Sequence, residues 1–296
     1  MDISPYVGWL ARCRFPLPPT SVVCAVSGGA DSAALAILAV AAGLHVHIVH
    51  VDHGLRGEGI GADEAETVRG LGRELGVEVD CVEVEVATTS NVEAVARKAR
   101  YAALPDGALT GHTRDDQLET VLLQLCRGGG IDALAGIRPE SRPLLALRRA
   151  DTVEVCETFG YTPIQDPTNE LMKFRRNRVR AEVVPLLDEI FERDVAEVVG
   201  RAADLVAAER DLLDRLAAAI DVTDVAAARS ADIAVLRRAI RQWLHVIHPP
   251  DAATVERVLA VIAGDRKATE IGGGRRVRRS AGKLHLEYSG SSASNH

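Results

Sequence analysis

The sequence predicts an α/β protein with a parallel-sheet domain over residues 1–189, a smaller, mainly helical C-terminal domain over 190–288 and a loose polar tail over 289–296. Two observations predict the first domain. Short apolar runs alternate with helix-length segments, and the first run breaks into a glycine-rich turn that leads into a helix. One observation predicts the second domain, because apolar residues beyond about residue 190 recur at helical spacing. Strands joined through helices form parallel sheets by right-handed crossovers.

The first strand, at about 22–26, leads through the turn Ser27-Gly28-Gly29-Ala30-Asp31-Ser32 into a helix at about 31–42. The two glycines allow a tight turn that presents backbone N–H groups to an anion, and the amino end of the helix adds its dipole. The turn has no lysine, which a Walker loop requires, and its glycines are adjacent, unlike those of dinucleotide folds. These residues predict a phosphate-binding loop, and a plain strand–helix turn is the ordinary alternative.

The alternation of strands and helices continues up to about residue 125. The second strand contains Val49 and ends near His50, and the fourth runs into Gly111 and His112. Ligands of parallel sheets bind beyond the carboxyl ends of the strands, where the strand order reverses. If the first strand neighbours the fourth, the glycine-rich turn and the segment 111–119 line one crevice. The expected strands are at 45–51, 79–86 and 108–110, and the expected helices are at 61–75 and 94–104.

The second domain begins with a long helical pattern. Val195, Val198, Val199 and Ala202 share one face of the first of its helices. Short strands around glycines are expected near the end of the chain, and they follow two more helices. These expected elements are helices at about 230–247 and 251–263, and strands within 270–288.

The amino-acid composition excludes several classes of protein. The chain has 296 residues, of which 47% are apolar and 26% charged, as in soluble globular proteins. It has neither an apolar run of about 18 residues nor a cleavable signal, so we expect a cytoplasmic protein without a membrane partner. Its five cysteines form no C-x-x-C pair, which argues against a disulfide framework, a zinc knuckle or a cysteine-held iron–sulfur cluster. The net charge is −7, yet arginines cluster in the later half, where they can attract phosphates.

Three carboxylates, Asp115, Asp116 and Glu119, stand at the start of the helix after the fourth strand. Taken alone, they are explained as complements of the helix dipole. Beside a phosphate-binding loop they suit the binding of Mg²⁺, of a cationic substrate, or of both. The basic run 174–180 likewise has two interpretations. It contacts phosphates if it faces RNA, and otherwise it is a charged helix start.

Together these stretches resemble the tRNA(Ile)-lysidine synthases, a family of PP-loop ATP pyrophosphatases with an adenine nucleotide alpha hydrolase-like fold. The glycine-rich turn, Ser-Gly-Gly-x-Asp-Ser, indicates only the superfamily. Two later elements are more specific: Gly-His-x-x-Asp-Asp-Gln-x-Glu-Thr at 111–120, and Asp-Pro-Thr-Asn at 166–169 followed by Arg-Asn at 176–177. The resemblance covers about 22–190 well and the remainder loosely.

The resemblance implies a ligase that forms a carbon–nitrogen bond. ATP would adenylate the 2-carbonyl oxygen of the wobble cytidine in a tRNA(Ile) with anticodon CAU, and the ε-amine of L-lysine would then displace AMP to give lysidine. ATP and Mg²⁺ are the implied cofactors, the C-terminal domain would bind tRNA, and a homodimer is one assembly state left open. The implied catalytic residues are Asp31, Asp116 and Glu119. The implied ATP contacts are Ser27, Gly28, Gly29, Ala30, Asp31, Ser32, Val49, His50, Gly111 and His112. The implied substrate contacts are Asp116, Glu119, Asp166, Arg175, Arg176, Arg178 and Arg180, and the implied metal contacts are Asp31, Asp115 and Asp116.

Two positions depart from the pattern of the family. Asp52 stands where the family commonly has Asn, and Thr113 where it often has His. Three alternative functions stay open: a PP-loop tRNA thiolase, an amide-forming synthetase that uses the same kind of adenylated intermediate, and a non-catalytic nucleotide- or RNA-binding module. A thiolase normally needs a pair or cluster of cysteines, and the cysteine spacing argues against it.

Overall fold

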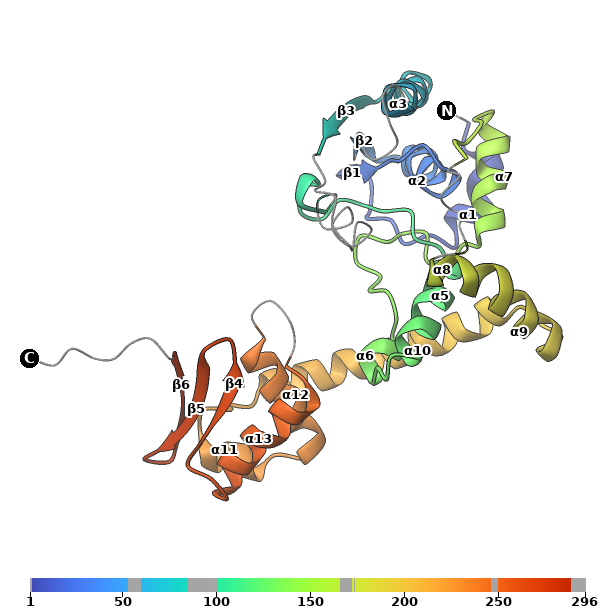
Figure 1. Ribbon diagram of the computed structural model, residues 1–296. Helices are drawn as coiled ribbons and strands as arrows, with labels where there is room; N and C mark the ends of the chain where they lie inside the picture. The colour runs from blue at the N-terminus through green and yellow to red at the C-terminus, as the bar shows by residue number, and fades with distance from the viewer. Residues whose placement is uncertain are drawn as a thin grey trace, which may run out of the picture. The chain divides into compact units, whose positions relative to one another are not determined.

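The computed structural model describes residues 2–52, 60–84, 99, 101–165, 172, 174–245 and 250–288. Most of the expected helix at 94–104, the Asp-Pro-Thr-Asn motif with Asp166, and the tail 289–296 lie outside the described residues. The chain divides into two compact units, Met1–Val206 and Ala207–His296 (Figure 1).

The N-terminal unit contains a parallel sheet. Its strands lie in the order β1 (Ser21–Ala25), β2 (His45–Asp52) and β3 (Glu78–Glu83). Cys24 of β1 pairs with Ile48 on one side and forms a parallel bridge with Leu109 on the other. The N–H of Leu109 donates to the carbonyl oxygen of Val23 at 2.7 Å. The first strand therefore neighbours the fourth segment, although the expected strand 108–110 is reduced to this single bridge, and the strand order reverses at β1.

Helix α2 (Ala30–Ala41) lies between the sheet and helix α7 (Arg149–Phe159) (Figure 1). Small and aliphatic residues cover all sides of α2 because it is packed on both faces, and Leu35, Ile37 and Leu38 are fully buried. The other elements before α7 are a 3-10 turn (Ser4–Tyr6), α1 (Val7–Leu10), α3 (Ile60–Leu75), α5 (Arg114–Leu125) and α6 (Ile131–Leu134).

A continuous helical stretch follows and supports α5. It consists of α8 (Arg175–Arg178), a π-helical segment (Val179–Val183) and α9 (Val184–Phe191). Pro185 explains the π-helical turn, because it has no N–H to donate and its ring crowds the carbonyl four residues earlier. The next helix, α10 (Val195–Ala218), packs Val195 and Ala196 on Leu118 of α5. These contacts fix the helix that carries the three carboxylates.

The C-terminal unit packs helices on an antiparallel sheet. Ile240, Val258 and Val261 of two helices are buried with Val277 and Leu284 of the sheet. The helices expected at about 230–247 and 251–263 and the strands expected within 270–288 are confirmed. The elements after α10 are α11 (Val225–Ser230), α12 (Ile233–Leu244), α13 (Ala252–Ala263), β4 (Ala268–Gly272), β5 (Arg275–Ser280) and β6 (Lys283–Tyr288). Within the described residues, no helix has both the length and the apolar character needed to cross a membrane.

Candidate functional site

The glycine-rich turn joins β1 to the amino end of α2. The hydroxyl of Ser32 accepts from the N–H of Ser27 at 3.0 Å and donates to the carbonyl oxygen of Gly29 at 2.9 Å, which closes the turn. Gly28 has φ +88°, a conformation that side chains rarely adopt, and a Cβ there would also collide with Ile164. The first turn of α2 thus begins directly after a tight loop. This arrangement is typical of anion-binding sites, because the free N–H groups of the helix start lie next to the loop.

The segment 161–164, far along the chain, forms hydrogen bonds to this loop. The carbonyl oxygen of Gly28 accepts hydrogen bonds from the Tyr161 hydroxyl at 2.9 Å and from the N–H of Ile164 at 3.0 Å. Burial raises the pKa of Tyr161 to about 12, so the hydroxyl keeps the proton that it donates. Sequence reasoning did not find these residues, because no local pattern marks the partner of a carbonyl group.

Gly111 brings the acidic helix to the phosphate loop. A Cβ on Gly111 would lie 2.7 Å from the carbonyl carbon of Asp31 and 3.0 Å from the amide nitrogen of Ser32, so the two backbones are in direct contact. The neighbouring His112 accepts or donates a hydrogen bond through Nδ1 to Thr110 Oγ1 at 2.9 Å. The two segments are therefore in contact, as the sequence led us to expect if the strands were adjacent.

Thr113 and Asp116 form the start of α5. Both the N–H and the hydroxyl of Thr113 donate to Asp116 Oδ2, at 2.9 and 3.0 Å. The fully buried threonine therefore has a structural role at a position where the sequence departs from the family pattern. Glu119 lies one turn further along the same face of α5 and is 1% exposed.

Three arginines neutralise the carboxylates of Asp31, Asp116 and Glu119. Arg149 donates to Asp31 Oδ2 at 3.3 Å and to Asp116 Oδ1 at 3.2 Å. Arg176 donates to Asp116 Oδ1 at 2.9 Å and to Glu119 Oε2 at 2.5 Å, and Arg180 donates to Glu119 Oε1 at 2.7 Å. The cluster therefore holds three negative and three positive charges. No local feature of the sequence indicated that Arg149 faces Asp31.

Burial and the arginines act in opposite directions on the two aspartates. Burial raises the pKa of Asp31, and Arg149 and the Thr152 hydroxyl only partly offset the effect. Burial would also raise the pKa of Asp116, but Arg149 and Arg176 outweigh it, so the pKa is lowered. Asp116 is therefore held ionised by its arginine partners, while Asp31 takes up a proton more readily than an exposed aspartate does.

Asp115 points to a different set of partners. Its carboxylate accepts from Arg148 Nε at 3.1 Å, from Arg148 Nη2 at 2.8 Å and from the N–H of Arg149 at 2.8 Å. Arg148 also pairs with Asp194. Asp115 thus joins α5 to the start of α7. In the described part of the chain, no three His, Cys, Asp or Glu side chains are grouped so that they could hold a metal ion by themselves.

Val49 and His50 lie in the buried middle of β2. The carbonyl oxygen of Val49 accepts from the N–H of Val26 at 3.0 Å, and Nδ1 of His50 is 2.9 Å from the carbonyl oxygen of Val26. Among the described residues, the buried Nε2 of His50 has no hydrogen-bond partner. Both residues therefore contact Val26, the residue that directly precedes the phosphate loop.

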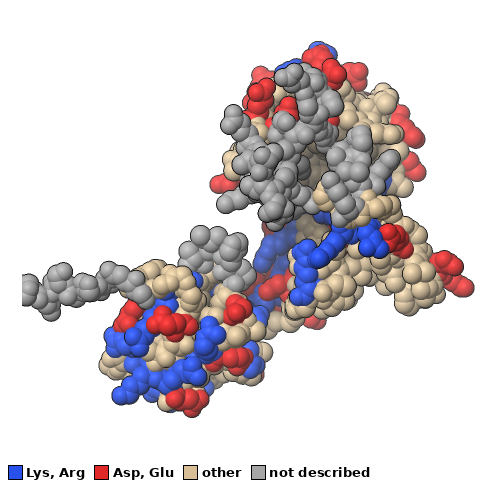
Figure 2. Space-filling model, viewed as in Figure 1, with Lys and Arg blue, Asp and Glu red and all other residues tan. Residues whose placement is uncertain are grey.

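The basic run after residue 174 divides into two sets. Arg176 and Arg180 point to the carboxylates, whereas Arg175 and Arg178 are exposed. Arg178 pairs with Glu182, with Nη2 and Oε2 2.7 Å apart. Figure 2 shows a patch of Lys and Arg side chains over α8. This patch is the part of the run that an external polyanion can contact.

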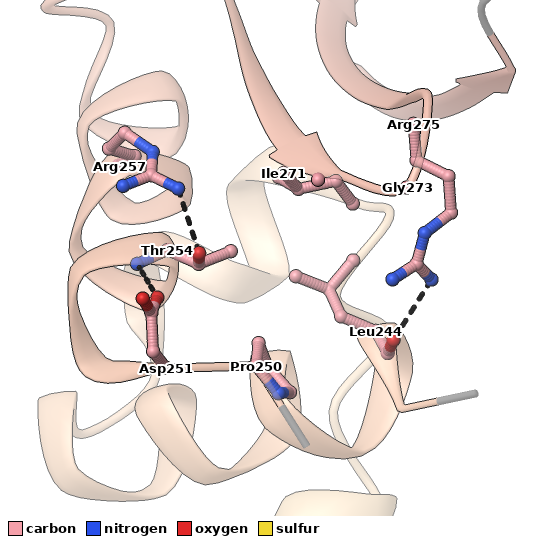
Figure 3. Close-up of a pocket in the computed structure, with 9 residues that line it drawn as sticks. Leu244, Pro250, Asp251, Thr254, Arg257, Ile271, Gly273 and Arg275 are labelled. Atoms are coloured by element: carbon pink, nitrogen blue, oxygen red, sulfur yellow. Dashed lines mark hydrogen bonds between the residues drawn. The ribbon is translucent and has the colours of Figure 1, made fainter. Parts of the chain in front are cut away.

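A pocket of about 440 Å³ lies in the C-terminal unit, between the start of α13 and the turn before β5 (Figure 3). Arg257 lines it and donates to Thr254 Oγ1 at 2.8 Å, and Arg275 lines it and donates to the carbonyl oxygen of Leu244 at 3.1 Å. Asp251 accepts from the N–H of Thr254 at 2.7 Å and so caps α13. The side chains of Arg257 and Arg275 therefore line one surface pocket from opposite sides.

Comparisons with known proteins show what this chain is similar to. The model of the PP-loop domain family matches residues 10–187. The tRNA(Ile)-lysidine synthase of Mycolicibacterium paratuberculosis is 45% identical, over 74% of this chain and 73% of that protein. The tRNA(Ile)-lysidine synthase of Thermobifida fusca is 39% identical, over 92% of this chain and 94% of that protein. Among solved structures, the U34-tRNA thiolase NcsA of Methanococcus maripaludis is 14% identical with a TM-score of 0.48, over 65% of this chain and 73% of that one.

Proposed function

This chain belongs to the tRNA(Ile)-lysidine synthase family, and we propose that the site formed by the starts of α2 and α5 joins L-lysine to the wobble cytidine of a tRNA(Ile) with anticodon CAU at the expense of ATP. The observation that carries this proposal is the direct backbone contact of Gly111 with Asp31 and Ser32. It brings a phosphate loop and an acidic helix into one site, so that a bound nucleotide and a cationic substrate can meet there.

The loop Ser27 to Ser32 and the amino end of α2 suit the phosphates of ATP, because N–H groups and the helix dipole both favour an anion. Arg149 contacts Asp31 of this loop, and Arg176 contacts Asp116 of the adjoining helix α5. We assign them to the neutralisation of the departing pyrophosphate. Transfer of AMP to the 2-carbonyl oxygen turns a poor electrophile into one with a good leaving group.

Asp31 and Asp116 fit a magnesium–nucleotide site. Nucleotide-bound Mg²⁺ is usually held by one or two carboxylates together with substrate phosphates, and these two carboxylates contact the same guanidinium group. When bound, the ion would neutralise phosphate charge. Asp115 fits less well, because its carboxylate faces Arg148 and the backbone at the start of α7 and does not share the Arg149 guanidinium with Asp31 and Asp116. We therefore propose that Asp115 aligns α5 with α7.

Asp116 and Glu119 suit the ammonium group of a lysine. Both carboxylates already accept hydrogen bonds from Arg176, so the ammonium group must take the place of that guanidinium. The amine nitrogen that attacks C2 of the base loses a proton as the bond from C2 to the AMP oxygen breaks. We assign the uptake of this proton to the carboxylates that hold the lysine, and of these Glu119 is the one not assigned to Mg²⁺.

Two surfaces suit the phosphates of tRNA. One is formed by the exposed Arg175 and Arg178 on α8, and the other by the half-buried Arg257 and Arg275 at the pocket of the C-terminal unit. The assignment of the C-terminal unit to tRNA binding stays a prediction from the sequence. The cytoplasm and the homodimer stay predictions, which fractionation and the solution mass would test.

The decisive experiment incubates the protein with ATP, Mg²⁺, radiolabelled L-lysine and a CAU transcript. We expect label in the RNA together with AMP and pyrophosphate, and no labelled RNA when any component is omitted. A transcript with a different wobble base is the matched control. Asp116→Asn should abolish lysine transfer while the protein stays folded. Transfer of sulfur rather than lysine would favour the thiolase alternative, and amide formation on a free metabolite would favour the synthetase alternative.

A further inference from the structure

We infer that Thr152 is a positioning residue for the proposed reaction, because its hydroxyl fixes the carboxylate of Asp31 in the nucleotide site. The inference rests on the proposed role of Asp31. Thr152 lies 121 residues after Asp31 in the chain, and no sequence motif marks it.

Helix α7 presents one face to the first turn of α2. Thr152 and Cys156, which are four residues apart and so on the same side of α7, are both fully buried. Thr152 Oγ1 donates to Asp31 Oδ1 at 2.5 Å, and Cys156 Sγ donates to the carbonyl oxygen of Ala30 at 3.5 Å. Two adjacent residues of α2 are therefore held by two residues of α7.

The two oxygens of Asp31 have separate partners. Oδ2 accepts from Arg149, whose guanidinium also contacts Asp116 and is partly exposed. Oδ1 accepts from Thr152, which is 0% exposed and so can touch no ligand. The contact from Thr152 therefore does not depend on what the Arg149 guanidinium binds during the reaction. It keeps the plane of the Asp31 carboxylate fixed.

The hydroxyl of Thr152 also lies 2.8 Å from the carbonyl oxygen of Arg149. A contact of this kind, from a threonine to the carbonyl three residues earlier, is common within helices and has only a local role. The hydroxyl has one proton, however, and the ionised carboxylate is the stronger acceptor. If the hydroxyl positions Asp31, its removal lowers turnover. If it serves only the Arg149 carbonyl within α7, its removal leaves turnover unchanged.

The test compares Thr152→Val, which keeps the volume but removes the hydroxyl, with Thr152→Ser, which keeps the hydroxyl. Turnover is measured in the full chain as AMP release with ATP, Mg²⁺, lysine and the CAU transcript. Thr152→Val removes a hydrogen bond to a charged carboxylate. The loss of such a bond predicts a roughly ten- to hundredfold lower kcat/KM for ATP in this variant. KM for lysine should stay within about twofold, and Thr152→Ser should restore turnover. Val153→Thr, on the exposed side of α7, is the matched control and should leave turnover unchanged.

A double-mutant cycle separates positioning from packing. If Thr152 acts through Asp31, adding Thr152→Val to Asp31→Asn lowers turnover no further. An equal loss in both backgrounds, or wild-type kcat/KM in Thr152→Val while Asp31→Asn is inactive, overturns the inference and leaves the proposed function intact. Normal turnover in Asp31→Asn overturns the proposed role of Asp31 and this inference with it. Thermal melts accompany every variant, and if Thr152→Val fails to fold, Thr152→Ala against Thr152→Ser provides the same comparison.

Discussion

Gly111 lies with its Cα against the carbonyl group of Asp31, so closely that any side chain at position 111 would overlap it. This contact joins the amino end of α2 to the segment that leads into α5. It therefore sets the separation of the phosphate loop from Asp116 and Glu119.

Gly111→Ala should separate these two segments. Overpacking of this kind costs about 1–3 kcal/mol, because the Asp31 backbone has to shift. We expect a loss of ATP affinity and of lysine transfer, with the far-ultraviolet circular dichroism spectrum retained. Gly8→Ala is the control, because a Cβ there meets no atom within 4 Å. Wild-type affinity for ATP in Gly111→Ala would contradict the backbone contact.

Arg176→Gln should have opposite effects on lysine binding and on adenylation. Arg176 hydrogen-bonds both Asp116 and Glu119, so it competes with an incoming ammonium group. Its removal should lower the Kd for free lysine, measured by calorimetry without nucleotide, and should slow AMP formation because a cation is lost beside the pyrophosphate. A weaker affinity for lysine would show that Arg176 does not occupy the lysine subsite.

Arg178→Ala should weaken tRNA binding in a salt-dependent manner. Each lysine or arginine that contacts a phosphate contributes about 0.9 to the slope of log K against log salt. We therefore expect that slope, measured by filter binding, to fall by roughly this amount. Arg73→Ala is a matched control, because Arg73 is also exposed and also pairs with a glutamate of its own helix. Equal slopes for Arg178→Ala and the wild type would remove α8 from the tRNA interface.

Acid should destabilise the N-terminal unit partly through Asp116. Its pKa is lower in the folded protein than in the unfolded chain, where aspartate has a pKa of about 3.9. The stabilisation is therefore fully present above about pH 4 and is lost as the pH falls through the lower, folded pKa. Asp116→Asn should show a lower urea midpoint at neutral pH and a weaker decline below pH 4. An unchanged acid dependence would show that Asp116 contributes little to this loss.

The elements of both units were largely predictable from local patterns. Apolar runs and glycine-rich turns specified β1, β2 and α2, and helical spacing specified α12 and α13, because these signals depend on neighbours within a few residues. The expected strand at 108–110 was too long, since the structure has only a single backbone bridge there, at Leu109. This one bridge is enough to place Gly111 beside α2.

The sequence alone determined that a phosphate loop and an acidic helix start are present, since each is a local motif. Only the tertiary structure decided which arginines face the carboxylates. Arg176 and Arg180 point to Asp116 and Glu119, and Arg178 points to Glu182, although all three come from one short run. Partners such as Thr152 and Asp31 are more than a hundred residues apart, and their pairing depends on how α7 packs against α2 rather than on spacing along the chain.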